Sequence, residues 1–342
     1  MIYLPEDLNV SVKKISSCFN NTSASYKFYW FISILDAVSE QKEKISKKEI
    51  FCRMIANAWY TINYFHLSFG KQDKLEEAIQ QLKIIENLDV DTKQENVFNT
   101  LFNSINKDTL VILNHFDSNV PHKFLSPWLG SSSQRDVYLM SQENFALPPY
   151  SLYKDYILIQ PAWFTYFFNN IGLLKSFCFW HLSRFLQVRN PNVPDVTSKL
   201  IRPEKRSSLT KHKKEFWDIV IREKNYIQCI YTGQELTVNN YDVEHFIPFQ
   251  FLAHDLMWNL VPSSAMFNRK KGDKLPSLDQ YFTKFYNTQT TAISVIRQKN
   301  EKNKFLEDYI SVFSSLEISE QKYRECLEPL ITLASNNGFQ FL

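Results

Sequence analysis

Runs of apolar and aromatic side chains dominate the first 190 residues and predict a mainly helical region. Residues 26–38 carry apolar side chains on nearly every side of a helix, which is typical of a buried helix, and residues 50–69 form a second apolar and aromatic run. A shorter amphipathic pattern covers residues 74–87, and Pro161 opens a strongly apolar helix over residues 163–187. The aromatic side chains could stack on unpaired bases, but core packing explains their periodicity better.

Turn-forming residues divide the remainder of the chain. Residues 155–160 read as a short strand, and the prolines of residues 189–194 end the preceding helix and indicate a linker. Beyond the central segment, apolar periodicity predicts three helices, over residues 278–287, 291–313 and 319–334. The pattern therefore places helical regions on both sides of a segment with a different periodicity.

That central segment begins with two short runs of β-forming residues, 226–231 and 241–247, separated by a polar stretch rich in turn residues. The pattern predicts a β-hairpin. A loop then leads to Ser263 and Ser264, either of which can cap a short helix over residues 265–271. The predicted order of this unit is strand, strand, helix.

A second strand and a following helix can face each other in such a unit, and this would bring Glu244 and His245 close to Asn268. Carboxylate and amide oxygens are hard ligands that suit Mg²⁺ or Mn²⁺. A neutral imidazole can accept a proton from water near physiological pH. The three side chains together would fit metal-assisted hydrolysis of a phosphodiester.

The ordered set Glu244-His245, Asn259 and Asn268 resembles the motif of HNH endonucleases of the ββα-metal type. The surrounding strings C-x-Y-T-G, E-H-F-I-P, N-L-V-P and N-x-x-K-x-D are similar to the zinc-free HNH domains of RNA-guided CRISPR effectors and of some restriction-type nucleases. The resemblance covers about fifty residues, and it implies a ββα-metal fold and an endonuclease activity.

The resemblance also implies a role for each matching residue. His245 corresponds to the general base that activates the attacking water, and Glu244, where many members have Asp, corresponds with Asn268 to the ligands of one divalent cation. Asn259 corresponds to the residue that ties the loop together and orients the histidine. The neighbouring His254 has no companion at ligand spacing, and we rank the pair His254-Asp255, in the loop before Asn259, well below His245 as a catalytic candidate.

The cysteines indicate neither structural zinc nor a disulfide framework. Cys229 has no CxxC partner, because Thr232 stands where the second cysteine would be, so a four-coordinate zinc site is not expected. An odd number of cysteines at long spacings favours free thiols in a reducing cytosol. There are five in all, Cys18, Cys52, Cys178, Cys229 and Cys326.

Charge is distributed unevenly although the net charge is only +3. Residues 199–224 hold nine Lys and Arg against four Asp and Glu, and residues 265–304 hold nine against three, whereas residues 231–264 hold four acids and no base. Two basic stretches around an acidic one suit a phosphate track beside a cation site, although solvated helix faces would look the same. The residues expected to contact nucleic acid are Lys211, Lys213, Lys214, Lys270, Lys271 and Lys274.

Length and composition complete the expected organisation. A chain of 342 residues with 44% hydrophobic residues and 6 glycines indicates a well-packed α+β protein, mainly α. We expect a helical N-terminal domain for target recognition or partner binding, a linker, an HNH nuclease domain, and C-terminal helices packing on it, at residues 1–190, 191–215, 216–285 and 286–342. No apolar run has the length of a membrane span and no signal peptide is recognisable, so we expect a cytoplasmic protein.

The expected function is a metal-dependent endonuclease acting on DNA, with Mg²⁺ or Mn²⁺ and without zinc. By analogy with relatives, it would serve bacterial restriction or anti-phage defence, as a homodimer or with a partner protein. Two alternatives remain open: a catalytically inactive DNA-binding or scaffold subunit, and an RNA-cleaving toxin.

Overall fold

The computed structural model describes residues 4–20, 22–143, 147–201 and 208–342. It confirms an α+β fold that is mainly α. The described chain separates into two compact units. Unit 1 comprises the residues up to Pro191 together with 196–201, and unit 2 comprises residues 192–195 and 208–342.

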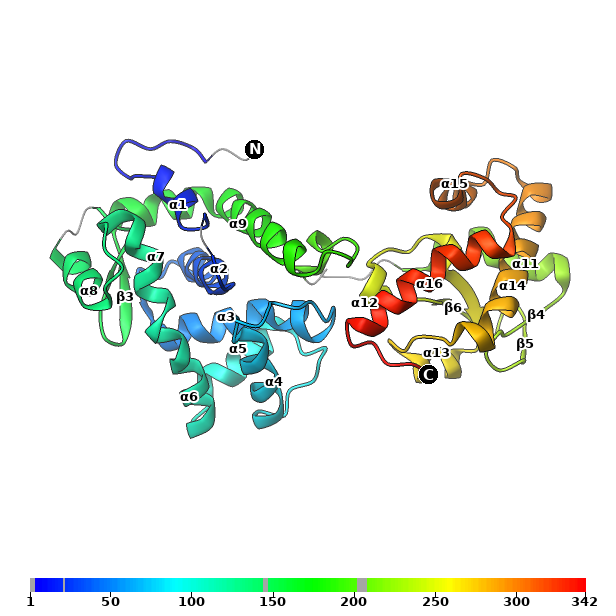
Figure 1. Ribbon diagram of the computed structural model, residues 1–342, viewed down its shortest axis with the longest axis horizontal. Coiled ribbons are helices and arrows are strands. Elements are labelled where there is room, and N and C mark those ends of the chain that lie inside the picture. Colours follow the sequence, from blue (N-terminus) through cyan, green and yellow to red (C-terminus); the bar gives the residue numbers. More distant parts are fainter. Residues whose placement is uncertain (1–3, 21, 144–146, 202–207) are drawn as a thin grey trace. The chain divides into compact units, whose positions relative to one another are not determined.

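Unit 1 is built around helix α2 (Tyr26–Ser39), which packs against α3 (Lys47–Asn63) and α9 (Pro161–Arg189). Figure 1 shows α2 between these two helices. The buried helix predicted over residues 26–38 is thus confirmed. The long helix that Pro161 opens is also present, but a non-helical backbone conformation at Asn170 kinks it. The other helices of the unit are α1 (Lys13–Ser17), α4 (Leu75–Ile85), α5 (Gln94–Asn103), α6 (Lys107–Asn114), α7 (Val120–Leu129), α8 (Gln134–Glu143) and the 3₁₀ turns η1 (His115–Ser118) and η2 (Thr197–Lys199).

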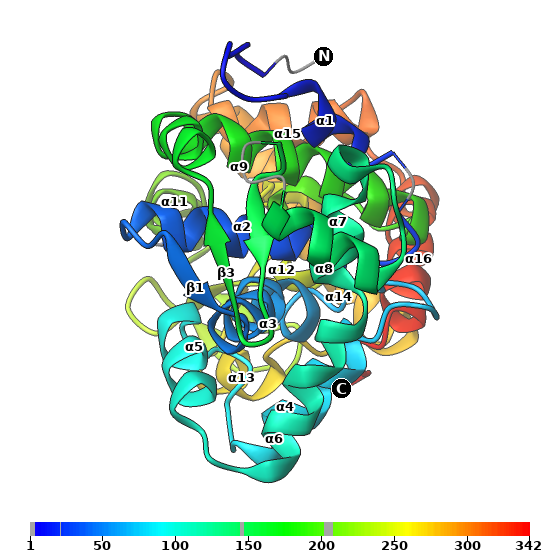
Figure 2. The ribbon, with the colours of Figure 1, turned by 90° about the vertical axis from the view of Figure 1, so that its left-hand side faces the viewer.

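A small antiparallel sheet lies beside these helices. Its strands β1 (Lys44–Ser46), β2 (Tyr150–Leu152) and β3 (Tyr156–Ile159) pair in the order β1-β3-β2, and Figure 2 shows β1 and β3 side by side. The strand predicted over residues 155–160 is therefore confirmed as β3. The sheet is tied to α2 by the buried indole of Trp30, whose Nε1 donates to the hydroxyl of Tyr150 at 2.8 Å.

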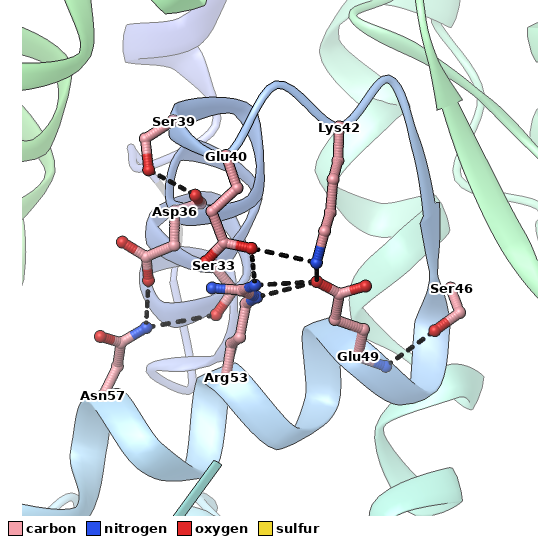
Figure 3. Close-up of polar contacts among 9 residues, drawn as sticks. All are labelled: Ser33, Asp36, Ser39, Glu40, Lys42, Ser46, Glu49, Arg53 and Asn57. Atoms are coloured by element: carbon pink, nitrogen blue, oxygen red, sulfur yellow. Dashed lines mark hydrogen bonds and ion pairs between the residues drawn. The ribbon is translucent and has the colours of Figure 1, made fainter. Parts of the chain in front are cut away.

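A network of charged side chains joins the end of α2 to α3 (Figure 3). Arg53 lies 2.6 Å from Glu40 and 2.8 Å from Glu49, and Lys42 lies 2.7 Å from Glu49. Arg53 and Glu49 are buried. Because each buried charge has an oppositely charged partner, the network orients the two helices without leaving an isolated ion in the core.

Unit 2 carries the central segment, from β4 to α13, and the helices around it. Its elements are α10 (Thr210–His212), the π-helical turn η3 (Lys213–Trp217), α11 (Asp218–Lys224), β4 (Ile227–Gln228), β5 (Glu235–Leu236), β6 (Asp242–His245), α12 (Phe249–Leu252), η4 (Met257–Asn259), β7 (Leu260–Ser263), α13 (Ala265–Lys271), α14 (Leu278–Lys299), η5 (Lys304–Leu306), α15 (Glu307–Phe313) and α16 (Glu320–Asn336). α14 packs against both α11 and β7.

The strand pairing in unit 2 differs from the predicted hairpin. β4 pairs with β5, and β6 pairs with β7, with Glu244 opposite Val261. The predicted pairing of residues 226–231 with 241–247 is therefore wrong. β6 instead pairs with residues that we expected in a loop, because Leu260 and Val261 are fully buried and the antiparallel ladder satisfies their backbone groups.

Two further boundaries differ from expectation. The helices predicted over residues 278–287 and 291–313 are in fact a continuous α14 that ends at Lys299 and a separate α15. Of the expected linker 191–215, residues 196–201 belong to unit 1, residues 202–207 lie outside the described residues, and residues 210–215 are helical. In the described part of the chain, no helix is long and apolar enough to cross a membrane.

Candidate functional site

The candidate site is formed by strand β6 and helix α13, which contact each other. β6 also pairs with β7. α13 starts directly after β7, because Ser264 acts as its N-cap and its Oγ accepts a hydrogen bond from the N–H of Phe267 at 3.3 Å. The cap determines where the helix begins. It thereby determines which helical residues face the strand.

His245 lies at the end of β6 and is held by a carboxylate. Its Nε2 lies 2.8 Å from Oδ1 of Asp255, and the imidazole is 6% exposed. The ring also packs edge-on against Phe249, with the centroids 5.6 Å apart. A carboxylate at Nε2 favours the tautomer with the proton on that nitrogen, which places the basic lone pair on Nδ1.

Glu244 is buried beside a lysine. Its Oε1 lies 2.6 Å from Nζ of Lys271, and its Oε2 accepts a hydrogen bond from the hydroxyl of Tyr231 at 3.1 Å. The same Nζ donates to the carbonyl oxygen of His245 at 2.9 Å. Burial, and next the charge of Glu244, hold the pKa of Tyr231 well above its usual value, so this hydroxyl stays a donor.

A cavity of about 380 Å³ connects the three predicted chemical groups, because Glu244, His245 and Asn268 all line it. Asn268 is partly exposed, and no hydrogen bond within the described residues engages its side chain. One carboxylate, one imidazole and one amide therefore border a single space that solvent can enter.

Asn259 is fully buried and does not line this cavity. Its side chain makes two hydrogen bonds to the backbone. Its Oδ1 accepts from the N–H of Ile247, and its Nδ2 donates to the carbonyl of Ile247, both at 2.8 Å. The side chain thus ties the chain just after β6 to the turn just before β7. A catalytic consequence of this tie stays a prediction.

The donor set can be tested against a divalent cation. The site presents a carboxylate and an amide oxygen, which are ligands for Mg²⁺ or Mn²⁺. A carboxylate has about four lone-pair positions, so Glu244 keeps acceptor capacity beside Lys271 and Tyr231. Within the described residues, no three His, Cys, Asp or Glu side chains are grouped to hold a metal ion, and all five cysteines are free thiols. The residues fit one hard cation that completes its coordination with water or substrate oxygen.

The predicted nucleic-acid contacts divide into two groups. Lys271 is 1% exposed and is paired with Glu244. The prediction that it contacts phosphate is therefore wrong for this structure. Lys213 is half-buried and donates to the carbonyl of Tyr241 at 2.5 Å while lying over its ring. The others, Lys211, Lys214, Lys270 and Lys274, are exposed.

Three side chains at the site were not among the site residues predicted from the sequence. Asp255 holds His245, Tyr231 holds Glu244, and His212 contacts the backbone of Asp255. Burial lowers the pKa of His212, while the nearby charges of Asp255 and Asp308 act in the opposite direction. Asp255 follows His245 by only ten residues, so a contact between the two was possible. Nothing in the local sequence showed that the intervening loop folds back toward His245.

Comparison with known proteins identifies this segment. Residues 229–277 match the HNH endonuclease family, which confirms the resemblance drawn from the sequence. Among characterised proteins, the CRISPR-associated endonuclease Cas9 of Listeria innocua serovar 6a is 42% identical over 53 residues, which are 15% of this chain and 4% of that protein. The chain thus spans a very small part of this relative. No solved structure matches the chain significantly.

Proposed function

We propose that this chain, whose residues 229–277 are of the HNH endonuclease family, is a metal-dependent endonuclease that hydrolyses phosphodiester bonds in DNA. The observation that supports this most directly is the cavity of about 380 Å³ bordered by His245, Glu244 and Asn268. In this proposal the cavity takes a phosphate and a water, with one of the three side chains acting as base and the other two as oxygen ligands.

His245 is the general base in this proposal. Asp255 holds the proton on Nε2, so Nδ1 accepts the proton of the water that attacks phosphorus. Asp255 also keeps the ring in one orientation and stabilises the imidazolium that forms, as a buried carboxylate does for histidine in other hydrolases. Asp255 is thus a positioning residue.

Glu244 and Asn268 would hold one divalent cation, Mg²⁺ or Mn²⁺. When bound, such an ion supplies positive charge that stabilises the charge developing on the phosphate and on the leaving 3′ oxygen. Tyr231 and Lys271 orient Glu244 from the protein side. The expected products carry a 5′-phosphate and a 3′-hydroxyl.

DNA is favoured as substrate because the resemblance to HNH endonucleases implies it. Bacterial restriction or anti-phage defence is favoured as the setting because the matched relative is by name a CRISPR-associated endonuclease. The five free thiols suit a reducing cytoplasm. One such site cuts one strand, so double-strand cleavage would require a homodimer, successive nicks or a partner protein. Equal phage plating on cells that carry the original chain and on cells that carry its His245→Ala variant would contradict the defence role.

The activity is tested by incubating the purified chain with plasmid DNA and, separately, with total RNA, each with Mg²⁺, Mn²⁺ or EDTA. Plasmid should be cut only with metal. His245→Ala should lower the rate by about 10²–10⁴-fold, since a general base contributes that much. Asn287→Ala, an exposed change on α14, should cut as the original chain does.

Each alternative has its own outcome. Cleavage of RNA with intact plasmid would indicate an RNA-cleaving toxin. Plasmid binding without cleavage in any metal would indicate an inactive DNA-binding or scaffold subunit. Cutting by His245→Ala at the original rate would contradict the assignment of the base.

A further inference from the structure

A second cavity, in unit 1, is lined by several basic side chains. It measures about 490 Å³ and lies between the start of α2, the start of α4 and the first turns of α7. Lys27, Lys74 and Lys123 line it together with His115, and among the described residues no carboxylate does. Asp73, in the loop before α4, is buried and accepts hydrogen bonds from the N–H groups of Ser25 and Leu75.

The lysines of this cavity are not neutralised equally. Lys74 lies 2.8 Å from Glu77, but Lys27 donates to the carbonyl of Cys18 at 3.2 Å, and Lys123 donates to the amide oxygen of Asn119 at 2.8 Å. Burial lowers the pKa of Lys27, and the charge of Lys123 lowers it further. Lys27 and Lys123 repel each other, and both donate only to neutral acceptors. An anion placed between the two ammonium groups would therefore stabilise both.

The hollow continues into an apolar one. A cavity of about 590 Å³ shares Lys74 and His115 with the first and has Ala78, Val111 and Ile112 in its wall. Its polar lining consists of Gln81, Asn114 and Glu77, whose carboxylate is paired with Lys74. Val111 is 69% exposed, so this wall is an uncovered apolar surface beside a cationic pocket. A ligand that suits both halves carries an anionic group at one end and a flat or apolar body at the other.

We propose that unit 1 binds a nucleotide here, with its phosphates between Lys27 and Lys123 and its base against Val111 and Ile112. The combined cavities have the size of a small-molecule site. A nucleic-acid strand is a poorer fit, because it needs cations repeated along a track, whereas these are gathered in one hollow. The proposal is independent of the nuclease activity, since binding alone measures it.

The test is calorimetric titration of the full chain in EDTA at constant ionic strength with inorganic phosphate, AMP, ATP and a short single-stranded oligonucleotide. ATP should bind more tightly than phosphate. Lys27→Gln/Lys123→Gln should weaken ATP and phosphate binding at least tenfold. The matched control Lys107→Gln/Lys154→Gln, which removes two exposed lysines of unit 1 outside the cavity, should change neither. The exposed Lys123→Gln alone covers the case in which loss of half-buried Lys27 disturbs folding.

Val111→Ser separates the two halves of the site. It should weaken ATP and AMP binding several-fold and leave phosphate binding unchanged. Failure of the chain to bind either nucleotide at millimolar concentration would overturn the proposal, and so would equal losses in the matched control. Tighter binding of the oligonucleotide than of ATP, lost in the same lysine variants, would assign the hollow to a nucleic-acid backbone instead.

Discussion

Glu244 combines two demands at the residue scale. It is 3% exposed and paired with Lys271, yet it must also offer an oxygen to a cation. Burying a charged pair costs several kcal/mol of desolvation per ion, which the mutual attraction and the added hydrogen bonds from Lys271 to His245 and from Tyr231 must offset. The pair is therefore most valuable for keeping the carboxylate in one orientation.

This predicts an asymmetric response to mutation. Lys271→Met leaves the carboxylate of Glu244 buried and unpaired, so it should lower the stability of the 229–277 segment by about 3–5 kcal/mol. Lys271→Met with Glu244→Gln removes both charges and should be much closer to the original chain. Hydrogen exchange of peptides from this segment measures the local free energy, which suits a chain of two units better than one melting temperature.

The neighbouring Lys270 is exposed and provides the control for that cycle. Lys270→Met should change exchange by less than about 0.5 kcal/mol, as surface substitutions usually do. A single Lys271→Met variant as stable as the double variant would show that the ion pair is not coupled to the fold.

A second residue-scale prediction concerns Asp255. Asp255→Asn keeps the size of the side chain but no longer favours the proton on Nε2 of His245. It should lower kcat by at least about tenfold, within the roughly 10²–10⁴-fold that the base contributes, and leave KM nearly unchanged. Steady-state rates on a short duplex would measure this. Asp279→Asn, on an exposed carboxylate, is the control, and a change in KM alone would contradict an orienting role.

At the same scale, the sequence was sufficient to predict that Glu244, His245 and Asn268 lie close together, but not which side chains contact them. Glu244, His245 and Asn268 could be brought together because a strand and a helix following each other allow few arrangements. Lys271 was assigned to phosphate although it lies three residues after Asn268, and helical residues at that spacing share a face. If Asn268 points to the cavity, Lys271 is also turned toward the strand, a consequence of helical periodicity that the prediction did not take into account.

At the scale of elements, strand β6 is held by its pairing with β7 and also by the side chain of Asn259, which ties the chain after β6 to the turn before β7. The hairpin prediction failed because two short β-forming runs do not specify their partners, and the buried side chains of Leu260 and Val261 made β7 the better one. Pro262 lies within β7 opposite Val243, so the pairing is short. The tie through Asn259 is accordingly important for the register of the two strands.

Asn259→Ala tests that tie. Both hydrogen bonds to Ile247 would be lost inside the fold, which should cost about 1–3 kcal/mol for each backbone group left unsatisfied. Hydrogen exchange in β6 and β7 should rise, and cleavage should fall because His245 lies two residues before Ile247. Asn287→Ala is the matched control. Unaltered exchange in both strands would mean that the ladder alone holds the register.

The long helices were better predicted than the short elements. α2 and α9 have apolar side chains over many turns, so the sequence pattern identified them as helices without knowledge of their tertiary contacts. Within residues 94–143 the chain forms α5, α6, α7 and α8, for which no helices had been predicted. Pro127 lies inside α7, where its local preference opposes a helix and only packing can maintain one.

At the scale of the whole molecule, the chain has two units with separate cores and separate charged cavities. The basic character predicted around residues 199–224 and 265–304 is partly used for structure, because Lys213 and Lys271 bond within unit 2. Of the six lysines predicted to contact nucleic acid, Lys211, Lys214, Lys270 and Lys274 are exposed, so the prediction stands for these four.

Replacing Lys211, Lys214, Lys270 and Lys274 with Gln distinguishes a phosphate track from solvated helix faces. In a His245→Ala background, which leaves DNA uncut, binding to all duplex sequences should weaken alike. The slope of log affinity against log salt should fall in magnitude by about 0.9 for every contact removed, because each contact releases counterions. Lys107→Gln/Lys154→Gln should leave the slope unchanged. An unaltered slope in the fourfold variant would contradict the track and would move the DNA-contacting surface to unit 1.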